Sequence, residues 1–232
     1  MAPTILDGKL MSEELIGEIG AEVQLMNNEH GVTPGLAVVL VGNNPASMVY
    51  VRNKSRAAKK AGMNSLIKRL PADASADQIV CTVQGLNRDP NYHGILVQLP
   101  LPDYVDEDSV ISSIDPNKDV DGLHPVNVGL LSSGIPRFVP ATPGGIREIL
   151  LRTGNNPSGK RVVILGRSNI VGRPLSNLLS MKGNGGDATV TVCHSRSKDL
   201  KQITLRADIL VAAIGIPDYL TKDLVAEGAG VV

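Results

Sequence analysis

The sequence lacks the features that are typical of proteins that bind nucleic acid, a membrane or a metal. Lys+Arg and Asp+Glu both number 23, so the zero net charge gives no electrostatic case for nucleic acid or an acidic membrane surface. The longest apolar runs, such as "ILVAAIGI", are strand-sized and too short to span a bilayer. The N-terminal "MAPTILDGKLMSEEL" lacks a basic stretch followed by an apolar run and predicts no secretory signal. Cys81 and Cys193 have no metal-type spacing, which indicates ordinary buried thiols in a reducing cytoplasm.

Aromatic side chains are also scarce, with four Tyr, one Phe and no Trp. Tyr50 is conspicuous because Lys54 follows it by one helical turn in "SMVYVRNKSRAAKKAG". On a helical wheel both share a face of small residues. The opposite side carries the other basic residues of this stretch, Arg52, Arg56, Lys59 and Lys60.

A lysine on a packed face needs a partner, a cavity or a ligand, because an isolated buried ammonium is costly. Burial disfavours the charged form of a lysine, so a buried Lys54 could act as a neutral base near neutral pH. The alternative is that Lys54 extends along the helix to solvent as an ordinary surface charge. The helical pattern alone leaves both interpretations open.

Expected strands and helices alternate along the chain. Strands are predicted over residues 35–42, 64–71, 93–100, 161–166, 188–195 and 208–215. Helices are predicted over residues 10–29, 46–61, 75–87, 106–114, 145–154, 172–182, 199–206 and 221–228. This alternation is typical of an α/β fold with parallel sheets and helices on both faces. The Pro- and Gly-bearing stretch around 136–145 marks a boundary, which predicts two α/β domains with a cleft between them.

A strand, a glycine turn and a helix follow one another in "VVILGRSNIVGRPLSNLL". The usual dinucleotide fingerprint is G-x-G-x-x-G, whereas this segment has Gly166, Ser168 and a late Gly172. Gly166 can still make the tight turn, and Gly172 can let the helix pack close to the strand. The N–H groups of the first helical turn would then face an anion. An ordinary strand–loop–helix joint is equally consistent with this motif.

The end of the next expected strand bears on the choice of cofactor. A site for NAD usually places a carboxylate there to bind the ribose 2′-hydroxyl. This strand ends instead in His194, Ser195, Arg196 and Ser197, and Arg167 lies in the glycine loop. Guanidinium and hydroxyl groups suit a 2′-phosphate, which favours NADP over NAD. Arg196 by itself could also be a solvated surface arginine.

Two further polar positions interrupt this pattern. Gln98 is the one polar residue within "ILVQL", at the carboxyl end of a predicted buried strand, where ligands bind in open α/β sheets. It could equally pair with a neighbouring loop. The motif "KDVDG" places Asp119 and Asp121 in a loop, where single aspartates usually form turns.

Taken together, these segments resemble the bifunctional methylenetetrahydrofolate dehydrogenase/cyclohydrolases of one-carbon metabolism. The resemblance runs from "ILDGK" to the last residues and rests on the order and spacing of several segments. They are "SMVYVRNKSRAAKKAG", "GILVQLPLP", "DPNKDVDGLHPVNVG", "PATPGGI", "GRSNIVGRP" and "CHSRS".

The resemblance implies a role for each of these residues. Lys54 is the catalytic lysine, Tyr50 stacks on the folate, Gln98 positions the lysine and Asp121 binds the pterin ring. The NADP site is lined by Thr142, Gly166, Arg167, Ser168, Gly172, Ser195 and Arg196. Residues 1–138 form a folate-binding catalytic domain and residues 139–232 a Rossmann-like NADP-binding domain. The family also implies a cytoplasmic homodimer that acts on a small folate and serves purine biosynthesis.

The sequence departs from the family at two points. Ala141 in "PATPGG" stands where many relatives have cysteine, which leaves the backbone and Thr142 in place. The chain stops at "GAGVV", whereas relatives continue with a Gly-rich segment and a long helix, which predicts a fragment or an incomplete sequence. Two other interpretations of the function remain open. The chain could be another two-domain NADP dehydrogenase resembling shikimate dehydrogenase, or an inactive truncated nucleotide-binding module.

Overall fold

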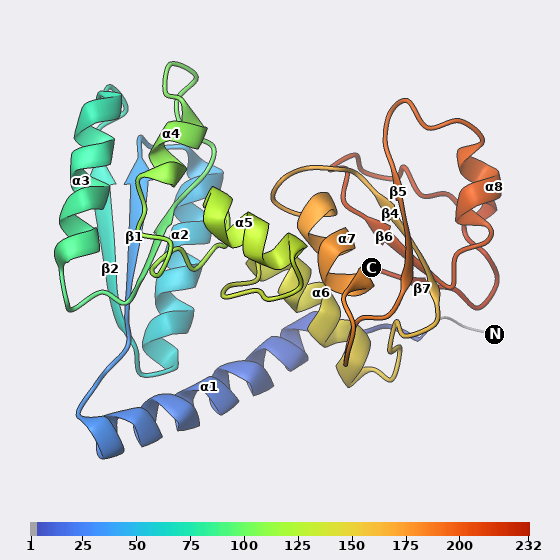
Figure 1. The fold of residues 1–232 in the computed structure, drawn as a ribbon, viewed down its shortest axis with the longest axis horizontal. Helices are drawn as coiled ribbons and strands as arrows, with labels where there is room; N and C mark the ends of the chain where they lie inside the picture. Colours follow the sequence, from blue (N-terminus) through green and yellow to red (C-terminus); the bar gives the residue numbers. More distant parts are fainter. Residues whose placement is uncertain (1–3) are drawn as a thin grey trace. The chain divides into compact units, whose positions relative to one another are not determined.

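The computed structural model describes residues 4–232, which form two compact units. One unit is Asp7–Pro125, and the other is Val126–Val232 together with residues 4–6. Each unit contains one sheet of parallel strands flanked by helices, which confirms the predicted α/β class (Figure 1). The functional domain limits proposed from the sequence, 1–138 and 139–232, stay a prediction. Within residues 4–232, no helix combines the length and apolar character needed to cross a membrane.

The unit Asp7–Pro125 is built on a three-stranded sheet with strand order β2-β1-β3. Its strands are β1 (Gly35–Val41), β2 (Asn64–Leu70) and β3 (Gly94–Val97). Its helices are α1 (Gly8–His30), α2 (Pro45–Lys60), α3 (Ala76–Arg88) and α4 (Glu107–Ser112). The predicted cap of α3 is confirmed, because Ser75 and Gln78 form a reciprocal capping box.

The side chains of β1 alternate between two apolar layers, as successive strand residues point to opposite faces. Val39 packs in one cluster with Ile79 of α3, whereas Val38 packs in another with Val51 of α2. Helix α2 therefore covers one face of this sheet, and α3 covers the other (Figure 1). Because β1 and β3 are parallel, their carboxyl ends lie at the same edge of the sheet. Gln98 lies at this edge, directly after the last residue of β3.

The second unit is built on a four-stranded sheet with order β5-β4-β6-β7. Its strands are β4 (Arg161–Leu165), β5 (Thr189–Cys193), β6 (Ile209–Ala212) and β7 (Gly230–Val231). Its helical elements are α5 (Pro125–Ser132), α6 (Ala141–Arg152), α7 (Gly172–Ser180), α8 (Leu200–Thr204) and the 3-10 turn η1 (Lys222–Leu224). Helices α6 and α7 pack on one face of this sheet and α8 packs near the other (Figure 1).

The sequence predictions were wrong at several element boundaries. The helix predicted over 221–228 is only the turn η1, because Val225 is extended and Gly228 has a φ of 80°. Helix α6 begins at Ala141 instead of residue 145, because Pro143 lies in the first turn, where its missing N–H costs no helical bond. The strand predicted over 93–100 is shorter, since Pro100 has no N–H to continue the ladder.

The structure also differs from the sequence predictions at one further helix and at one cysteine. Helix α5 was not predicted, because its apolar residues carry little helical periodicity and follow a Gly- and Pro-bearing loop. Cys81 is exposed and not buried as predicted, whereas Cys193 is buried. Ile79 and Val83 lie on the buried face of α3. Cys81 lies two positions from each of them, so its side chain points away from that face.

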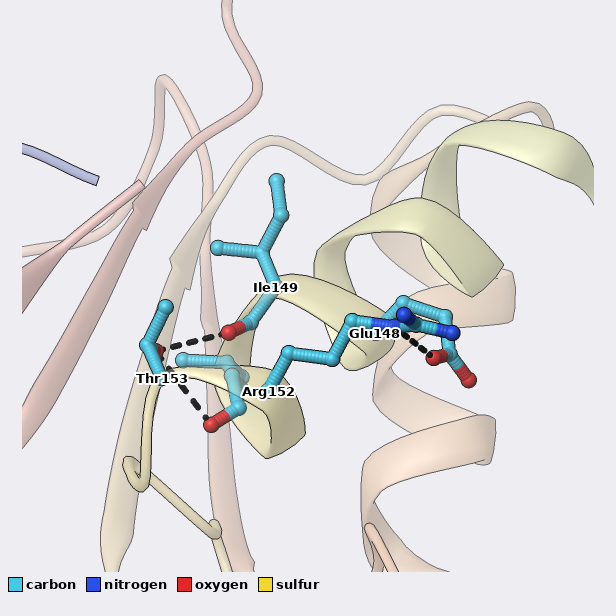
Figure 2. Close-up of polar contacts among 5 residues, drawn as sticks. Glu148, Ile149, Arg152 and Thr153 are labelled. Atoms are coloured by element: carbon cyan, nitrogen blue, oxygen red, sulfur yellow. Dashed lines mark hydrogen bonds and ion pairs between the residues drawn. The ribbon is translucent and has the colours of Figure 1, made fainter. Parts of the chain in front are cut away.

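The carboxyl end of α6 is closed by side-chain contacts. The Thr153 hydroxyl donates to the Ile149 carbonyl oxygen at 2.7 Å and approaches the Leu150 carbonyl oxygen at 3.4 Å (Figure 2). One turn apart, Arg152 Nε donates to Glu148 Oε2 at 3.1 Å. The Thr153 hydroxyl thus adds a second donor to the Ile149 and Leu150 carbonyl oxygens, which also accept from the backbone N–H groups of Thr153 and Asn155.

The amino ends of β4 and β6 are tied by an exposed ion pair. Asp208 accepts hydrogen bonds from the Arg161 backbone N–H at 2.7 Å and from its guanidinium at 3.0 and 3.2 Å. These side-chain and backbone hydrogen bonds lower the pKa of Asp208 to about 2.

The depressed pKa of Asp208 predicts a pH dependence of stability. A carboxyl with a lowered folded-state pKa stabilises the fold above its unfolded value and loses that effect as pH falls through the folded value. We expect Asp208→Asn to be less stable than the wild type near pH 6 and to converge with it as the pH falls toward about 2. Urea unfolding midpoints measured across this range test the prediction, with the exposed Asp103→Asn as control. A constant difference between Asp208→Asn and wild type at every pH would contradict it.

Candidate functional site

The side chains of α2 are distributed differently from the helical-wheel expectation. The buried positions are Ser47, Val51, Ser55 and Ala58, so the buried stripe is centred one residue beyond Tyr50 and Lys54. Tyr50 is 62% exposed, and the Lys54 side chain is 35% exposed. The expectation of a packed face is thus wrong for Tyr50 and only partly met for Lys54. The remaining basic residues of α2 are solvent-exposed, as predicted.

Lys54 has an acidic neighbour in the loop that follows α4. Its Nζ lies 4.0 Å from Asp121 Oδ2, and the Asp121 side chain is 25% exposed. Burial raises the pKa of Asp121, the Lys54 ammonium lowers it, and the nearby Asp119 carboxylate raises it again. Lys54 is therefore not a fully solvated charge, because it shares a partly desolvated site with a carboxyl group.

The loop carrying Asp121 is attached to β3 by backbone contacts. Asp119 forms an isolated parallel bridge with Ile95, and the Ile95 N–H donates to the Lys118 carbonyl oxygen at 2.7 Å. Gly122, with a φ of 64°, then turns the chain and donates to the Asp119 carbonyl oxygen at 3.1 Å. Asp121 is thereby placed beside the same sheet whose edge carries Gln98.

In the side-chain amide of Gln98, the nitrogen has a hydrogen-bond partner and the oxygen has none among the described residues. Its backbone N–H donates to the Val39 carbonyl oxygen at 2.9 Å, which fixes it at the carboxyl edge of the sheet. Its Nε2 donates to the Leu99 carbonyl oxygen at 2.7 Å. Its Oε1 is buried and has no hydrogen-bond partner among the described residues. Such an acceptor costs about 1–3 kcal/mol until a donor reaches it, so Gln98 is suited to a lysine ammonium or a ligand N–H.

The glycine turn of the second unit confirms the close packing expected from its motif. Gly166 follows β4 with a φ of 114°, and a Cβ there would overlap the Ala213 carbonyl oxygen. A Cβ at Gly172 would overlap the Gly166 carbonyl group. Ser168 closes the turn, because its Oγ accepts from Val171 N–H at 3.1 Å. Only glycine fits at either position without moving the backbone.

The amino end of α7 is left open by this turn. The helix has no side-chain cap, although Arg173 N–H donates to the Ser168 carbonyl oxygen at 3.1 Å and Pro174 has no N–H. Arg167 and Ser168 are exposed beside it. The Arg167 guanidinium, the Ser168 hydroxyl and the helix dipole favour an anion at this end, and an anion site here stays a prediction.

The strand next to β4 ends at the same edge. β4 and β5 pair in parallel with Leu165 opposite Cys193, so the turn after Cys193 lies beside Gly166. In that turn His194 N–H donates to Ser197 Oγ at 2.9 Å, and Arg196 N–H donates to His194 Nδ1 at 3.2 Å. Ser195 and Arg196 are left exposed. The structure therefore brings the glycine turn and the "CHSRS" turn together at one sheet edge.

An apolar pocket of about 140 Å³ opens at this edge. Its lining includes Leu165, Cys193, His194, Ser195, Leu200, Ile214, Ile216 and Tyr219. Among these, Leu165, Leu200 and the last three residues were not predicted from the sequence. The last three follow β6 and could have been found by noting that β6 also ends at this edge. Burial raises the pKa of the Cys193 thiol, so this cysteine contributes apolar surface instead of a reactive thiolate.

Thr142 was also assigned to the cofactor site from the sequence. It lies in the first turn of α6 with an exposed side chain.

The structure thus brings together Gly166, Arg167, Ser168 and Gly172 with Ser195 and Arg196 in one unit. It brings Lys54 beside Asp121 in the other unit.

Comparison with protein families matches both units of the chain. Residues 6–121 match the model described as tetrahydrofolate dehydrogenase/cyclohydrolase, catalytic domain. Residues 140–232 match tetrahydrofolate dehydrogenase/cyclohydrolase, NAD(P)-binding domain. The family expected from the sequence is therefore confirmed, and the shikimate dehydrogenase-like alternative is not favoured.

Individual relatives agree with the family models. The bifunctional protein FolD of Syntrophobacter fumaroxidans is 47% identical over all of this chain and 79% of its own length. That of Parvibaculum lavamentivorans is 51% identical over all of this chain and 76% of its own length.

Solved structures give the same result. The FolD dehydrogenase/cyclohydrolase of Campylobacter jejuni superposes with a TM-score of 0.93 at 42% identity, over 99% of this chain and 80% of that one. The Trypanosoma brucei enzyme complexed with NADP and an inhibitor has a TM-score of 0.93 at 36% identity, over 99% of this chain and 78% of that one.

Proposed function

The chain belongs to the tetrahydrofolate dehydrogenase/cyclohydrolase family, and we propose that it oxidises 5,10-methylenetetrahydrofolate with NADP⁺ and hydrolyses the 5,10-methenyl product to 10-formyltetrahydrofolate. The observation that carries this function is that both family domains match, each over one unit of the chain. A nucleotide-binding module alone would need only the second unit.

The dehydrogenase step requires alignment more than it requires a base. NADP⁺ supplies the hydride acceptor, and the ring nitrogens of the folate stabilise the cation that remains. The exposed Tyr50 ring provides a face on which the folate can stack and be oriented. Asp121 presents a carboxylate to the amino–amide edge of the pterin as a charge-assisted pair. Correct placement of the methylene carbon then accounts for most of the acceleration that the protein provides.

The cyclohydrolase step requires proton transfers, which we assign to Lys54. Water attacks the methenyl carbon, and the ring opens after protons move between the attacking oxygen and a ring nitrogen. The Lys54 ammonium lies in a partly desolvated position 4.0 Å from Asp121. The unsatisfied Oε1 of Gln98 is suited to accept from Lys54 and hold its Nζ toward the reacting carbon.

The cofactor site is assigned to the second unit. Gly166, Ser168 and Gly172 would hold the pyrophosphate at the amino end of α7. Arg167, Ser195 and Arg196 would bind the 2′-phosphate, and Thr142 would complete the lining. The exposed hydroxyl and guanidinium groups and the absence of a carboxylate at positions 194–197 support NADP over NAD.

Arg167→Ala is expected to weaken NADP⁺ much more than NAD⁺. A guanidinium that binds the 2′-phosphate contributes a charge-assisted hydrogen bond, so NADP⁺ affinity should fall by about 10- to 100-fold. Steady-state kcat/KM for both cofactors gives the result, with the exposed Arg206→Ala as control. An equal loss for NADP⁺ and NAD⁺ would show that Arg167 does not read the 2′-phosphate.

Binding experiments separate this function from its alternatives. The chain should bind NADPH and tetrahydrofolate in calorimetric titrations and should not bind shikimate. Binding of NADPH without tetrahydrofolate would support a nucleotide-binding module and count against the proposed enzyme. A turnover assay on the same sample then distinguishes an active enzyme from an inactive binder.

We also place the enzyme in the cytoplasm, in the one-carbon metabolism that serves purine biosynthesis, and expect it to act as a homodimer. These assignments rest on the family, and the dimer is expected to form through the cofactor-binding units. Analytical ultracentrifugation at micromolar concentration should show a species of twice the chain mass of 24.4 kDa. A stable monomer under these conditions would contradict the dimer.

A further inference from the structure

Asp119 is a buried carboxylate that the proposed chemistry does not use. Its relative exposure is 1%, although aspartate is almost never fully buried unless it is paired. It lies two residues before Asp121, on the same short loop. A buried charge next to the folate-binding carboxylate needs a physical explanation.

The contacts of Asp119 define the shape of the loop. Its Oδ2 accepts from the His124 backbone N–H at 2.9 Å, and its carbonyl oxygen accepts from Gly122 N–H at 3.1 Å. Its backbone pairs with Ile95 of β3. Asp119 thus closes residues 119–124 into a turn anchored to the sheet, and Asp121 lies within that turn.

Asp119 also acts on Asp121 through charge. The charged groups that affect Asp121 are Lys54 from α2 and Asp119 from its own loop. Lys54 favours the ionised form of Asp121, and Asp119 opposes it, so the Asp119 carboxylate raises the pKa of Asp121. Geometry and electrostatics therefore both connect Asp119 to the folate-binding carboxylate.

We propose that Asp119 is a positioning residue, which holds the Asp121 carboxylate in the orientation that binds the folate and acts on the reaction only through it. This inference rests on the proposed role of Asp121. In this role Asp119 need not touch either the substrate or the cofactor.

Asp119→Ala removes the acceptor that closes the turn. We expect its KM for methylenetetrahydrofolate to rise about tenfold, as for the loss of one buried hydrogen bond to a charged group. The Kd for NADPH, which reports the other unit, should not change. Asp115→Ala is the matched control, because Asp115 closes a similar turn earlier in the loop by accepting from Asn117 N–H at 2.8 Å. An unchanged KM in Asp119→Ala would overturn the proposal.

Asp119→Asn keeps a side-chain oxygen for His124 and removes the charge, so it tests the proposal even if Asp119→Ala does not fold. Its KM at neutral pH should stay within about threefold of wild type. In the pH profile of folate binding, the acid limb of Asp119→Asn should shift to lower pH. The reason is that the Asp119 charge, which raises the pKa of Asp121, is removed. A KM raised as far as in Asp119→Ala would overturn the proposal, because the substituted side chain still accepts from the His124 N–H.

A double-mutant cycle distinguishes this inference from the function on which it rests. Asp121→Ala should weaken folate binding by itself, and adding Asp119→Ala should then have little further effect. A wild-type KM in Asp121→Ala would sink the proposed role of Asp121. Equal and additive losses in the two backgrounds would instead show that Asp119 acts independently of Asp121.

Discussion

Lys54→Met is expected to reduce the hydrolysis of methenyltetrahydrofolate by about 10²- to 10⁴-fold, the contribution of a positioned acid or base. Methionine keeps the apolar stem and roughly the volume of lysine, so packing in α2 should survive. The dehydrogenase rate should fall much less, because hydride transfer needs alignment and no base. Stopped assays of the two steps on the same sample give the comparison.

Two variants of α2 make this result specific. Lys59→Met removes an exposed lysine from the same helix and should leave both rates unchanged. Tyr50→Phe keeps the ring that we propose to stack on the folate and should cost less than Lys54→Met. A wild-type rate of hydrolysis in Lys54→Met, with the substitution confirmed by mass, would show that Lys54 is only a surface charge.

Gly172→Ala is expected to weaken NADPH binding by roughly 10- to 100-fold. The added Cβ would overlap the Gly166 carbonyl group, so the glycine turn or the start of α7 must move. Such overpacking typically costs about 1–3 kcal/mol, and here the displaced groups are those that we propose to face the pyrophosphate. Calorimetric titration with NADPH measures the effect, and tetrahydrofolate binding should stay unchanged.

A matched helical glycine controls for the effect of the added methyl group. Gly129 lies in α5, where a Cβ would meet no atom within 4 Å, so Gly129→Ala should leave NADPH binding unchanged. Wild-type affinity in a folded Gly172→Ala would show that the close approach of α7 to the turn is not needed for the cofactor.

The fold was predicted well where local pattern and packing agree. The continuous apolar runs of β1, β4 and β6 are buried on both faces and are recognisable from the sequence alone. The prediction failed over 221–228, where helix-forming residues are present but Val225 is extended and Gly228 turns the chain. In that segment tertiary packing overrides helix propensity.

The candidate site was predictable in part. The spacing of Tyr50 and Lys54 identified the helix, but the wheel could not show that Tyr50 is exposed, because the buried stripe depends on which face of α2 meets the sheet. The pairing of Lys54 with Asp121 joins residues far apart in the chain, so no local pattern contains it. The burial of Asp119 is likewise a property of the folded loop, since its neighbours in sequence are those of an ordinary turn.

The most direct test of the account is the stoichiometry of the two products made by the wild-type enzyme. Methylenetetrahydrofolate and NADP⁺ are supplied together, and NADPH and 10-formyltetrahydrofolate are measured in the same sample over time. We expect both to form in equal amounts, and we expect Lys54→Met to form NADPH with accumulation of methenyltetrahydrofolate. Wild-type enzyme that forms NADPH while 10-formyltetrahydrofolate appears only at the uncatalysed rate would contradict it.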